Sequence, residues 1–425
     1  LYQWTVVAVS NATGLPLVQA GRAVSLGCFY GALAALFPLL GALGLAWPRR
    51  LVVMGLALTC PLYIFYARGF LIEMMALMAA LWFLAAFGRM ITAPSWGRYL
   101  LVAVVGVLAG LVKVTTFMVF LIPAALWTLH VLRREPTGGA VVRRGLWAVA
   151  AIMPAVATAG WWTKFADAVK HRNPNAGFLE SGNLLEFNFG TVANRFSADT
   201  LSSHWFHISH NLVGPLSLAV GAVLMVAAGR AWWRQIGLCL GCYLATLAIF
   251  PTLYAWHDYY AVANAMLLLA AIGVAVAATL DWRARWLGWV VVIGLYAIQL
   301  GTYGRTYFEL QRIESPGGSM MTKAIELMTE PDEALVVTGY DWDSSVAFYS
   351  RRRALMIRSG MEWNRPYLAD AFKFQAEAKS RIAVLVIRNA RDQDVEILKA
   401  ASRLLDIDPR PVFTWQGVDV FARRD

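Results

Sequence analysis

Charged residues are scarce in this chain. Only 15% of its 425 residues are Asp, Glu, Lys or Arg, and 59% are hydrophobic, whereas a soluble globular protein carries about a quarter charged residues. This shortage excludes a soluble protein of ordinary composition. Apolar runs instead fill most of residues 23–303, and several reach the roughly 20 residues that a helix needs to cross a bilayer. The sequence therefore predicts a polytopic membrane protein.

Acidic residues are especially rare in the apolar part of the chain. Residues 1–304 hold 8 acidic and 19 basic residues, whereas residues 305–425 hold 18 of each. A nucleic-acid-binding protein gathers its basic residues on one soluble face. Here they lie in short loops between apolar runs, which excludes nucleic acid as a partner. The apolar runs predict about ten spans, near residues 23–46, 51–67, 70–88, 99–114, 116–132, 145–163, 211–229, 235–254, 259–280 and 286–303.

The loops between these spans alternate in charge. Every second loop is rich in arginine, and these loops together contain only two acids, Glu135 and Asp281. Cytoplasmic loops carry an excess of Lys and Arg, so these loops are predicted inside, and both chain ends and the long 164–210 loop outside. The twelve arginines are Arg49, Arg50, Arg89, Arg98, Arg133, Arg134, Arg143, Arg144, Arg230, Arg234, Arg283 and Arg285.

Cysteine is also rare, and all four cysteines lie inside apolar runs. Cys239 and Cys242 have CxxC spacing without a second ligand pair nearby, which favours small packing residues over a redox or metal site. His204 and His207 have a spacing that a helical metal site would need. No carboxylate lies beside them in the sequence, so ordinary interfacial histidines are the favoured interpretation and no metal site is predicted.

Two expectations concern the ends of the chain. No cleavable signal peptide is visible, because the opening LYQWTVVAVSNATG has neither a basic stretch nor a Met. The missing Met predicts that a native segment precedes Leu1. Residues 304–425 predict a small α/β domain, because residues 334–338 and 382–387 are short apolar runs typical of buried strands. Residues 394–405 have helical spacing, and residues 412–422 alternate as a hairpin.

Ionisable residues at the ends of spans indicate a site, because charges are costly in a membrane. The acids Glu73 and Asp258 and the basic residues Arg68, Lys113 and His257 all fall at the predicted outer surface. Cations would offset the charge of a lipid phosphate, and a carboxylate would orient or deprotonate an acceptor. Three alternatives stay open: snorkelling cations, a structural pair of Arg68 with Glu73, and Asp258 as a helix N-cap.

Three segments carry a resemblance to a known family. They are Tyr66-Ala-Arg-Gly-Phe-Leu-Ile-Glu73, Gly110-Leu-Val-Lys113 and Trp256-His-Asp-Tyr-Tyr260. In order and predicted sidedness they resemble motifs of the GT-C superfamily of integral-membrane glycosyltransferases. The nearer likeness is to bacterial relatives of protein O-mannosyltransferases and of the lipid A aminoarabinose transferase. The resemblance covers nearly the whole chain.

The resemblance implies an enzyme with a GT-C helical bundle (residues 1–303) and an extracytoplasmic C-terminal domain (residues 304–425) in a bacterial inner membrane. It implies transfer of a hexose or pentose from a polyprenyl-phosphate donor to a lipid, glycan or protein hydroxyl on the outer face. Glu73 matches the second, helix-borne acid of the family, whose principal acid and first helix are expected before Leu1. No cofactor is fixed by the resemblance, and a divalent metal is an open alternative. The groups that would bind the donor phosphate or line the site are Arg68, Lys113, His257, Tyr260 and Asp258.

Two other functions compete with this interpretation. A lipid-linked oligosaccharide ligase or polymerase also uses a large outer loop and cations. A transporter or flippase places charges at the bilayer midplane, whereas here they gather toward one face. The corner from Arg68 to Glu73 and the neutral C-terminal domain favour the single-sugar transferase.

Overall fold

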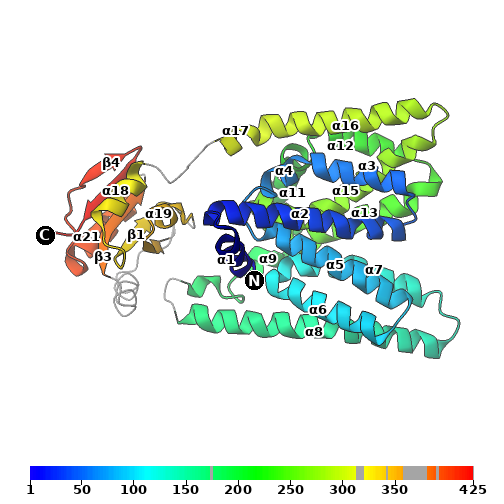
Figure 1. Ribbon diagram of the computed structural model, residues 1–425, viewed down its shortest axis with the longest axis horizontal. Helices are drawn as coiled ribbons and strands as arrows, with labels where there is room; N and C mark the ends of the chain where they lie inside the picture. Colours follow the sequence, from blue (N-terminus) through cyan, green and yellow to red (C-terminus); the bar gives the residue numbers. More distant parts are fainter. Residues whose placement is uncertain (173–175, 313–319, 341–342, 358–380, 389–391, 425) are drawn as a thin grey trace. The chain divides into compact units, whose positions relative to one another are not determined.

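The computed structural model describes residues 1–172, 176–312, 320–340, 343–357, 381–388 and 392–424. The chain forms two compact units, one of residues 1–163 with 185–312 and one of residues 164–184 with 313–425. The first unit is a bundle of helices, and the second contains a five-stranded sheet. Figure 1 labels the elements of both units.

The helical part of the chain begins with α1 and ends with α17. Its helices are α1 (Tyr2–Thr13), α2 (Leu17–Ala42), α3 (Trp47–Thr59), α4 (Pro61–Tyr66), α5 (Glu73–Thr92), α6 (Trp96–Val112), α7 (Val114–Leu132), α8 (Gly138–His171), α9 (Leu185–Phe189), α10 (Val192–Phe196), α11 (Ala198–Phe206), α12 (Pro215–Ala227), α13 (Arg230–Ile249), α14 (Pro251–Trp256), α15 (Ala261–Ala278), α16 (Arg285–Thr306) and α17 (Phe308–Arg312). Four short turns accompany them: η1 (Gly177–Leu179), the π-helix η2 (His207–Leu212), η3 (Asp258–Tyr260) and η4 (Thr279–Asp281).

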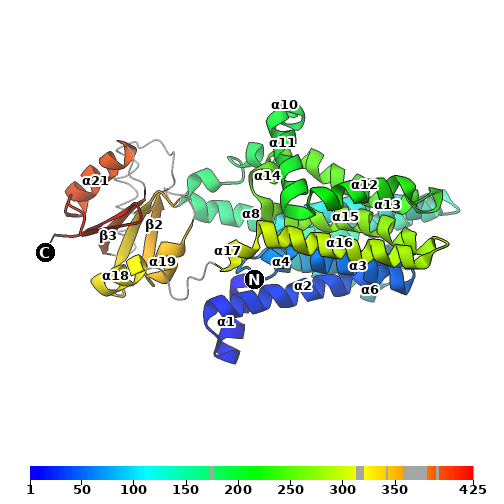
Figure 2. The same cartoon turned by 90° about the horizontal axis from the view of Figure 1, so that it is seen from above.

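Helix α15 is the centre of the bundle, since all 18 of its residues are buried. It packs against α13, α3 and α12, and α5 packs against α2, α6 and α7. Figures 1 and 2 show these long helices running side by side. Some of the polar groups inside are bonded: Asn264 Nδ2 donates to Thr246 Oγ1 at 2.9 Å, and Tyr63 Oη donates to the Val262 carbonyl at 3.1 Å. A helix that is apolar on every side fits this central place.

The predicted fold class, a polytopic helical bundle with a small C-terminal α/β domain, is confirmed. The predicted count of ten spans is approximate. Among the described residues, six helices are long and apolar enough to cross a membrane alone, or seven if the bent pair of residues 198–212 and 215–227 counts as one span. The other predicted spans correspond to shorter or less apolar helices, such as α6 with 17 residues.

Two predicted spans are each divided by a proline. The predicted span 51–67 is α3 and α4, which meet at Cys60 before Pro61. The predicted span 235–254 lies within α13 and α14, which meet at Phe250 before Pro251. Proline lacks the N–H that a helix requires and disfavours helical geometry in the preceding residue. Each break starts a short new helix, and these two helices lead to Tyr66 and to the turn that holds Asp258.

The second unit has a mixed sheet with strand order β2-β1-β3-β5-β4. β1 pairs in parallel with β2 and β3, while β5 pairs antiparallel with β3 and β4. Helix α21 packs on one face, and α18 and α19 pack on the other. The elements are α18 (Met320–Met328), β1 (Ala334–Thr338), α19 (Ser345–Tyr349), β2 (Arg353–Ile357), β3 (Ile382–Arg388), α21 (Asp392–Leu404), β4 (Phe413–Trp415) and β5 (Val418–Ala422).

The elements predicted for this unit from the sequence are confirmed. β1 and β3 are the two predicted buried strands, and α21 is the predicted helix. The predicted hairpin is β4 and β5, joined by Gln416 with φ 47° and Gly417 with φ 76°. Two consecutive residues at positive φ form the tight turn that the twist of a two-residue hairpin requires.

Residues 164–184 belong to the predicted outer loop: residues 164–171 are the end of α8, and residues 176–184 fold back on them. Asp167 accepts hydrogen bonds from the Ser181 backbone N–H at 3.0 Å and from Lys170 Nζ at 3.2 Å. Lys170 also donates to the Leu179 carbonyl at 2.7 Å. His171 Nδ1 lies 3.0 Å from Glu180 Oε1. These bonds fix the path of the chain on both sides of residues 173–175.

Candidate active site

Glu73 lies at the first position of α5, after the turn that follows α4. The predicted span 70–88 puts this residue about one turn inside its helix, but in the structure the helix begins at Glu73 itself. Its side chain is only 4% exposed. A carboxylate at a helix N-terminus is stabilised by the unpaired N–H groups and dipole of the helix. The fold therefore helps to hold a buried acid where it is otherwise costly.

Lys113 lies at the break between α6 and α7. Its backbone is extended, with φ −161° and ψ 104°, so the two helices are separate rather than one kinked span. Three residues earlier, Gly110 packs closely against α8: a Cβ there would lie 3.3 Å from the Ala155 carbonyl oxygen and 3.2 Å from the Ala159 Cβ. Glycine has no side chain and therefore permits this close approach of α6 to α8. The end of α6 lies beside α5.

Glu73 and Lys113 form the central ion pair of the site. Lys113 Nζ lies 2.6 Å from both carboxylate oxygens of Glu73. The Lys113 side chain is 17% exposed, so it retains access to the surroundings while its partner is buried. An ammonium has three N–H donors, and one remains after two are given to the carboxylate. The alternative that Arg68 pairs with Glu73 is wrong, because Glu73 pairs with Lys113.

Two tyrosine rings lie around the same ammonium. Lys113 Nζ is 4.5 Å from the ring centroid of Tyr260 and 5.8 Å from that of Tyr259. Both distances are within the range in which an aromatic face attracts a cation. Phe187 packs edge-on against Tyr260 at 6.4 Å. The ammonium is thus held by one carboxylate and by aromatic faces.

Asp258 is the second acid of the site. It lies in η3, two residues before Tyr260, and accepts hydrogen bonds from Tyr66 Oη at 2.6 Å and from Tyr307 Oη at 2.7 Å. Burial, followed by the neighbouring Asp258 carboxylate, raises the pKa of Tyr307 well above its ordinary value. The phenol therefore stays protonated and remains a donor. The N-cap interpretation of Asp258 is wrong, because no side-chain cap bond is made to η3 or α15.

The remaining predicted residues lie at the rim. His257 is exposed and stacks on Tyr259, with ring centroids 5.1 Å apart and planes 17° apart. Arg68 is exposed and donates to Gln311 Oε1 of α17 at 3.1 Å. Gln311 also donates to the Phe65 carbonyl at 3.2 Å and accepts from Tyr303 Oη. The structure thus brings together Glu73, Lys113 and Tyr260, adds Asp258 and His257 through one turn, and leaves Arg68 on a neighbouring corner.

Three residues of this cluster were not singled out from the sequence: Tyr259, Tyr307 and Gln311. Tyr259 lies within the segment from Trp256 to Tyr260, so its contact with Lys113 had a local signal. Tyr307 and Gln311 lie beyond the last predicted span and meet Asp258 and Arg68 only through the fold. Nothing in their local sequence marks them.

The histidines of the outer loop have a different role from a metal site. His204 Nε2 lies 2.8 Å from the Pro251 carbonyl oxygen, and His207 Nε2 lies 3.2 Å from that of Ala255. Both therefore connect the 198–212 segment to α14. In the parts of the chain that the structure describes, no three His, Cys, Asp or Glu side chains are grouped so as to hold a metal ion.

The two units together define a structural class. The helical bundle and the small α/β unit have the fold of the GT-C membrane glycosyltransferases, as the sequence resemblance predicted. No family model matches the chain, and no curated protein matches its sequence.

Three solved structures show the likeness. Crystal structures of ArnT from Cupriavidus metallidurans match with undecaprenyl phosphate bound (TM-score 0.59, 15% identity, 99% of this chain and 87% of ArnT) and in the apo state (0.60, 14%, 99% and 86%). The mycobacterial arabinofuranosyltransferase AftD matches with a TM-score of 0.56 and 13% identity, over 99% of this chain and 35% of AftD.

Proposed function

We propose that this protein is a membrane glycosyltransferase that moves a sugar from a polyprenyl-phosphate donor to an acceptor hydroxyl. The observation that carries the proposal is the ion pair of Glu73 and Lys113, enclosed by tyrosines at one end of a membrane bundle with a transferase fold. A carboxylate and a partly exposed ammonium at one place are the two groups that such a transfer needs. The undecaprenyl phosphate bound to ArnT is a lipid of the class that we propose as the donor carrier.

The reaction would proceed by displacement at the anomeric carbon. The acceptor oxygen forms a bond to that carbon, the bond from carbon to phosphate oxygen breaks, and polyprenyl phosphate leaves with the bonding electrons. Configuration is inverted. The negative charge that grows on the phosphate is stabilised by a cation already in place, which is the main contribution an enzyme makes to such a step.

Lys113 is the cation that we assign to the phosphate. Its third N–H is not used by Glu73, and its side chain is partly exposed. When a phosphate draws the ammonium, an oxygen of Glu73 loses a donor and becomes free to accept the acceptor's proton. We therefore propose that Glu73 serves as an acid–base group. Tyr260 and Asp258 would line the site, and Arg68 and His257 would bind phosphate or sugar at the rim.

The orientation is also part of the proposal. The loops rich in arginine lie at the other ends of the spans, and this distribution supports a cytoplasmic position for them. The end of the bundle with Glu73, the segment 164–210 and residues 304–425 would then lie on the outer face of the inner membrane. This is the leaflet in which a polyprenyl-phosphate sugar would reach Lys113.

The test is a transfer assay in proteoliposomes. Radiolabelled polyprenyl-phosphate hexose and pentose are supplied with membrane lipid extract as acceptor, and loss of label from the donor lipid is measured. We expect Glu73→Gln to abolish transfer while the protein remains folded. Glu135→Gln is the matched control, because Glu135 is also paired, with Arg144 at 2.8 Å, but near the arginine-rich ends of the spans. Full transfer by Glu73→Gln would contradict the role of Glu73 as an acid–base group.

A further inference from the structure

A second feature of the bundle is a cavity that the proposed transfer does not use. It has a volume of about 650 Å³ and lies between α2, α5, α7, α13 and α15. Such a volume is typical of a small-molecule site. Its walls are mostly leucine, alanine and other apolar side chains, and none of the residues that line it is acidic. Its polar groups gather at one place, where α7 ends and α13 begins: His130, Arg133, Arg134, Arg234 and Gln235.

The cationic end of this cavity lies far from the candidate active site. Lys113 immediately precedes α7, and His130 is near the other end of that 19-residue helix. At 1.5 Å per residue the two ends of α7 are about 28 Å apart. The cationic end of the cavity and the Glu73–Lys113 pair therefore lie at opposite ends of the same helix, whereas the apolar walls of the cavity extend along α7 as far as Phe120.

The cations at this cavity have no acidic partner in the described structure. The nearest acids in the sequence are already engaged, since Glu135 pairs with Arg144 and Asp281 pairs with Arg49. Arg234 Nη2 instead lies 3.1 Å from Nδ1 of His130 and 3.3 Å from its Nε2. A guanidinium can only donate, so a group from α13 and a group from α7 meet here without a negative charge between them.

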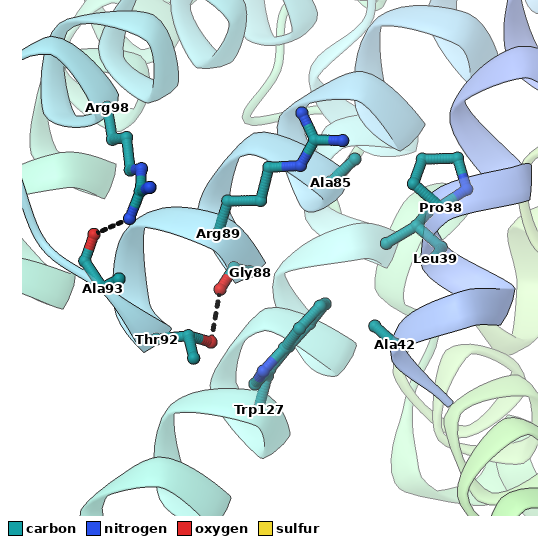
Figure 3. Close-up of a pocket in the computed structure, with 10 residues that line it drawn as sticks. All are labelled: Pro38, Leu39, Ala42, Ala85, Gly88, Arg89, Thr92, Ala93, Arg98 and Trp127. Carbon is teal, nitrogen blue, oxygen red and sulfur yellow. Dashed lines mark hydrogen bonds between the residues drawn. The ribbon is translucent and has the colours of Figure 1, made fainter. Parts of the chain in front are cut away.

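A smaller cavity of about 320 Å³ adjoins the first. Both are lined by Leu39, Ala42 and Trp127. Figure 3 shows the indole of Trp127 between α2 and the Gly88 turn of α5, with Arg89 and Arg98 on the same cavity. A Cβ at Gly88 would lie 2.1 Å from the Trp127 ring, so this glycine provides the space for the indole. The apolar interior thus continues from the larger cavity into the smaller one, which two further arginines, Arg89 and Arg98, also line.

Arginines at the ends of spans have an ordinary explanation, which is the orientation of the protein in the membrane. Orientation requires only that basic residues lie in the loops. It does not require that arginines from two separate helices converge, nor that they surround the opening of an apolar cavity. An anionic head group with apolar chains complements both properties, and basic pockets between membrane helices bind anionic lipids in this way.

We propose that the cavity between α2, α5, α7, α13 and α15 binds an anionic glycerophospholipid. Its phosphate lies among His130, Arg133, Arg134 and Arg234, and an acyl chain extends along the apolar walls toward Trp127. This site is separate from the site of sugar transfer and does not depend on the proposed reaction.

The experiment uses the purified full chain in detergent with added lipid. Native mass spectrometry and thermal unfolding are measured with phosphatidylglycerol and with phosphatidylcholine that carries the same acyl chains. We expect bound phosphatidylglycerol and a higher Tm with that lipid only. The variant Arg133→Gln/Arg134→Gln/Arg234→Gln should bind phosphatidylglycerol about a hundredfold more weakly. Its Tm in phosphatidylcholine should equal that of the parent protein, which shows that it is folded.

Two matched variants make the test specific. Arg230→Gln/Arg283→Gln/Arg285→Gln removes the same charge from exposed positions that do not line the cavity, and it should bind as the parent does. Leu238→Trp fills the cavity at a position that is 37% exposed without a change of charge, and it should lose binding. Equal binding of both lipids, an equal Tm rise with inorganic phosphate alone, or unchanged binding in either the Arg133/Arg134/Arg234 variant or Leu238→Trp would overturn the proposal.

Discussion

Positive charge has different surroundings at the two ends of α7. Before its first residue, Lys113 is held by the Glu73 carboxylate and by the faces of two tyrosines. Beyond its last turn, the arginines at 133, 134 and 234 have no acidic partner among the described residues and surround an apolar cavity. A balanced, half-buried charge can exchange its partner during a reaction. An unbalanced exposed cluster can only attract an anion. The first arrangement suits catalysis, and the second suits the binding of a lipid.

The largest expected effect concerns the Glu73–Lys113 pair. Lys113→Met leaves a 4% exposed carboxylate without its partner, and breaking a buried pair costs about 3–5 kcal/mol. The double variant Glu73→Gln/Lys113→Met removes both charges and should recover most of that loss. The free energies of unfolding of the parent, Glu73→Gln, Lys113→Met and the double variant, measured in one detergent, give the coupling energy. A double variant as unstable as Lys113→Met would show that the two charges are not coupled.

The next effect concerns Asp258, which accepts from two tyrosines on separate elements. Asn at this position keeps one acceptor oxygen, so Tyr66 or Tyr307 loses its partner. Hydrogen bonds to a charged group are worth about 1.5–3 kcal/mol each, and we expect Asp258→Asn to lower the free energy of unfolding by about 2 kcal/mol. Tyr66→Phe and Tyr307→Phe each remove one bond together with its hydroxyl, so that no tyrosine is left without an acceptor, and should cost less. If the unfolding curve of Asp258→Asn coincides with that of the parent, these bonds do not stabilise the site.

A smaller effect is expected from the ring of Tyr260. Tyr260→Phe keeps the aromatic face over Lys113 Nζ, which is 4.5 Å from its centroid, whereas Tyr260→Leu removes it. A cation and an aromatic face attract each other by about 0.5–2 kcal/mol, so the leucine variant should be less stable than the phenylalanine variant by that amount. Chemical unfolding of the two variants measures the difference. Equal stabilities would show that the ring contributes packing alone.

The smallest effect is expected at an exposed ion pair, which contrasts with the buried Glu73–Lys113 pair. Arg49 and Asp281 also form an ion pair, but their side chains are 25% and 47% exposed. Exposed pairs contribute about 0–1 kcal/mol. Asp281→Asn should therefore change the free energy of unfolding by less than about 1 kcal/mol, well below the effect of Lys113→Met. A loss as large as that of Lys113→Met would mean that burial does not distinguish the two pairs.

Individual charges in the site could be predicted from the sequence, but their partners could not. Glu73 and Lys113 stand out because each is an ionisable residue beside an apolar run. Their contact joins positions 40 residues apart, and Tyr307 meets Asp258 across 49 residues. Such pairs depend on which helices pack together, and hydropathy carries no information about that. The alternative that paired Glu73 with Arg68 was accordingly wrong.

The fold class followed from composition, whereas the helix boundaries did not. Hydropathy predicts residues 51–67 as one continuous apolar segment, because a single proline, Pro61, does not interrupt the apolar run. The missing N–H of Pro61 nevertheless starts a new helix, α4, and Pro251 has the same effect at α14. In the C-terminal unit the signals were local, namely short apolar strands and the turn at Gln416 and Gly417, and there the predicted elements agree with the structure.

A density map of the protein with undecaprenyl phosphate is the most direct test of the central claim. The account predicts the phosphate beside Lys113 Nζ, with the Glu73 carboxylate and the rings of Tyr259 and Tyr260 around it. A phosphate among Arg133, Arg134 and Arg234, or a lipid that crosses the middle of the bundle, would contradict the assignment of the Glu73–Lys113 end as the site of transfer.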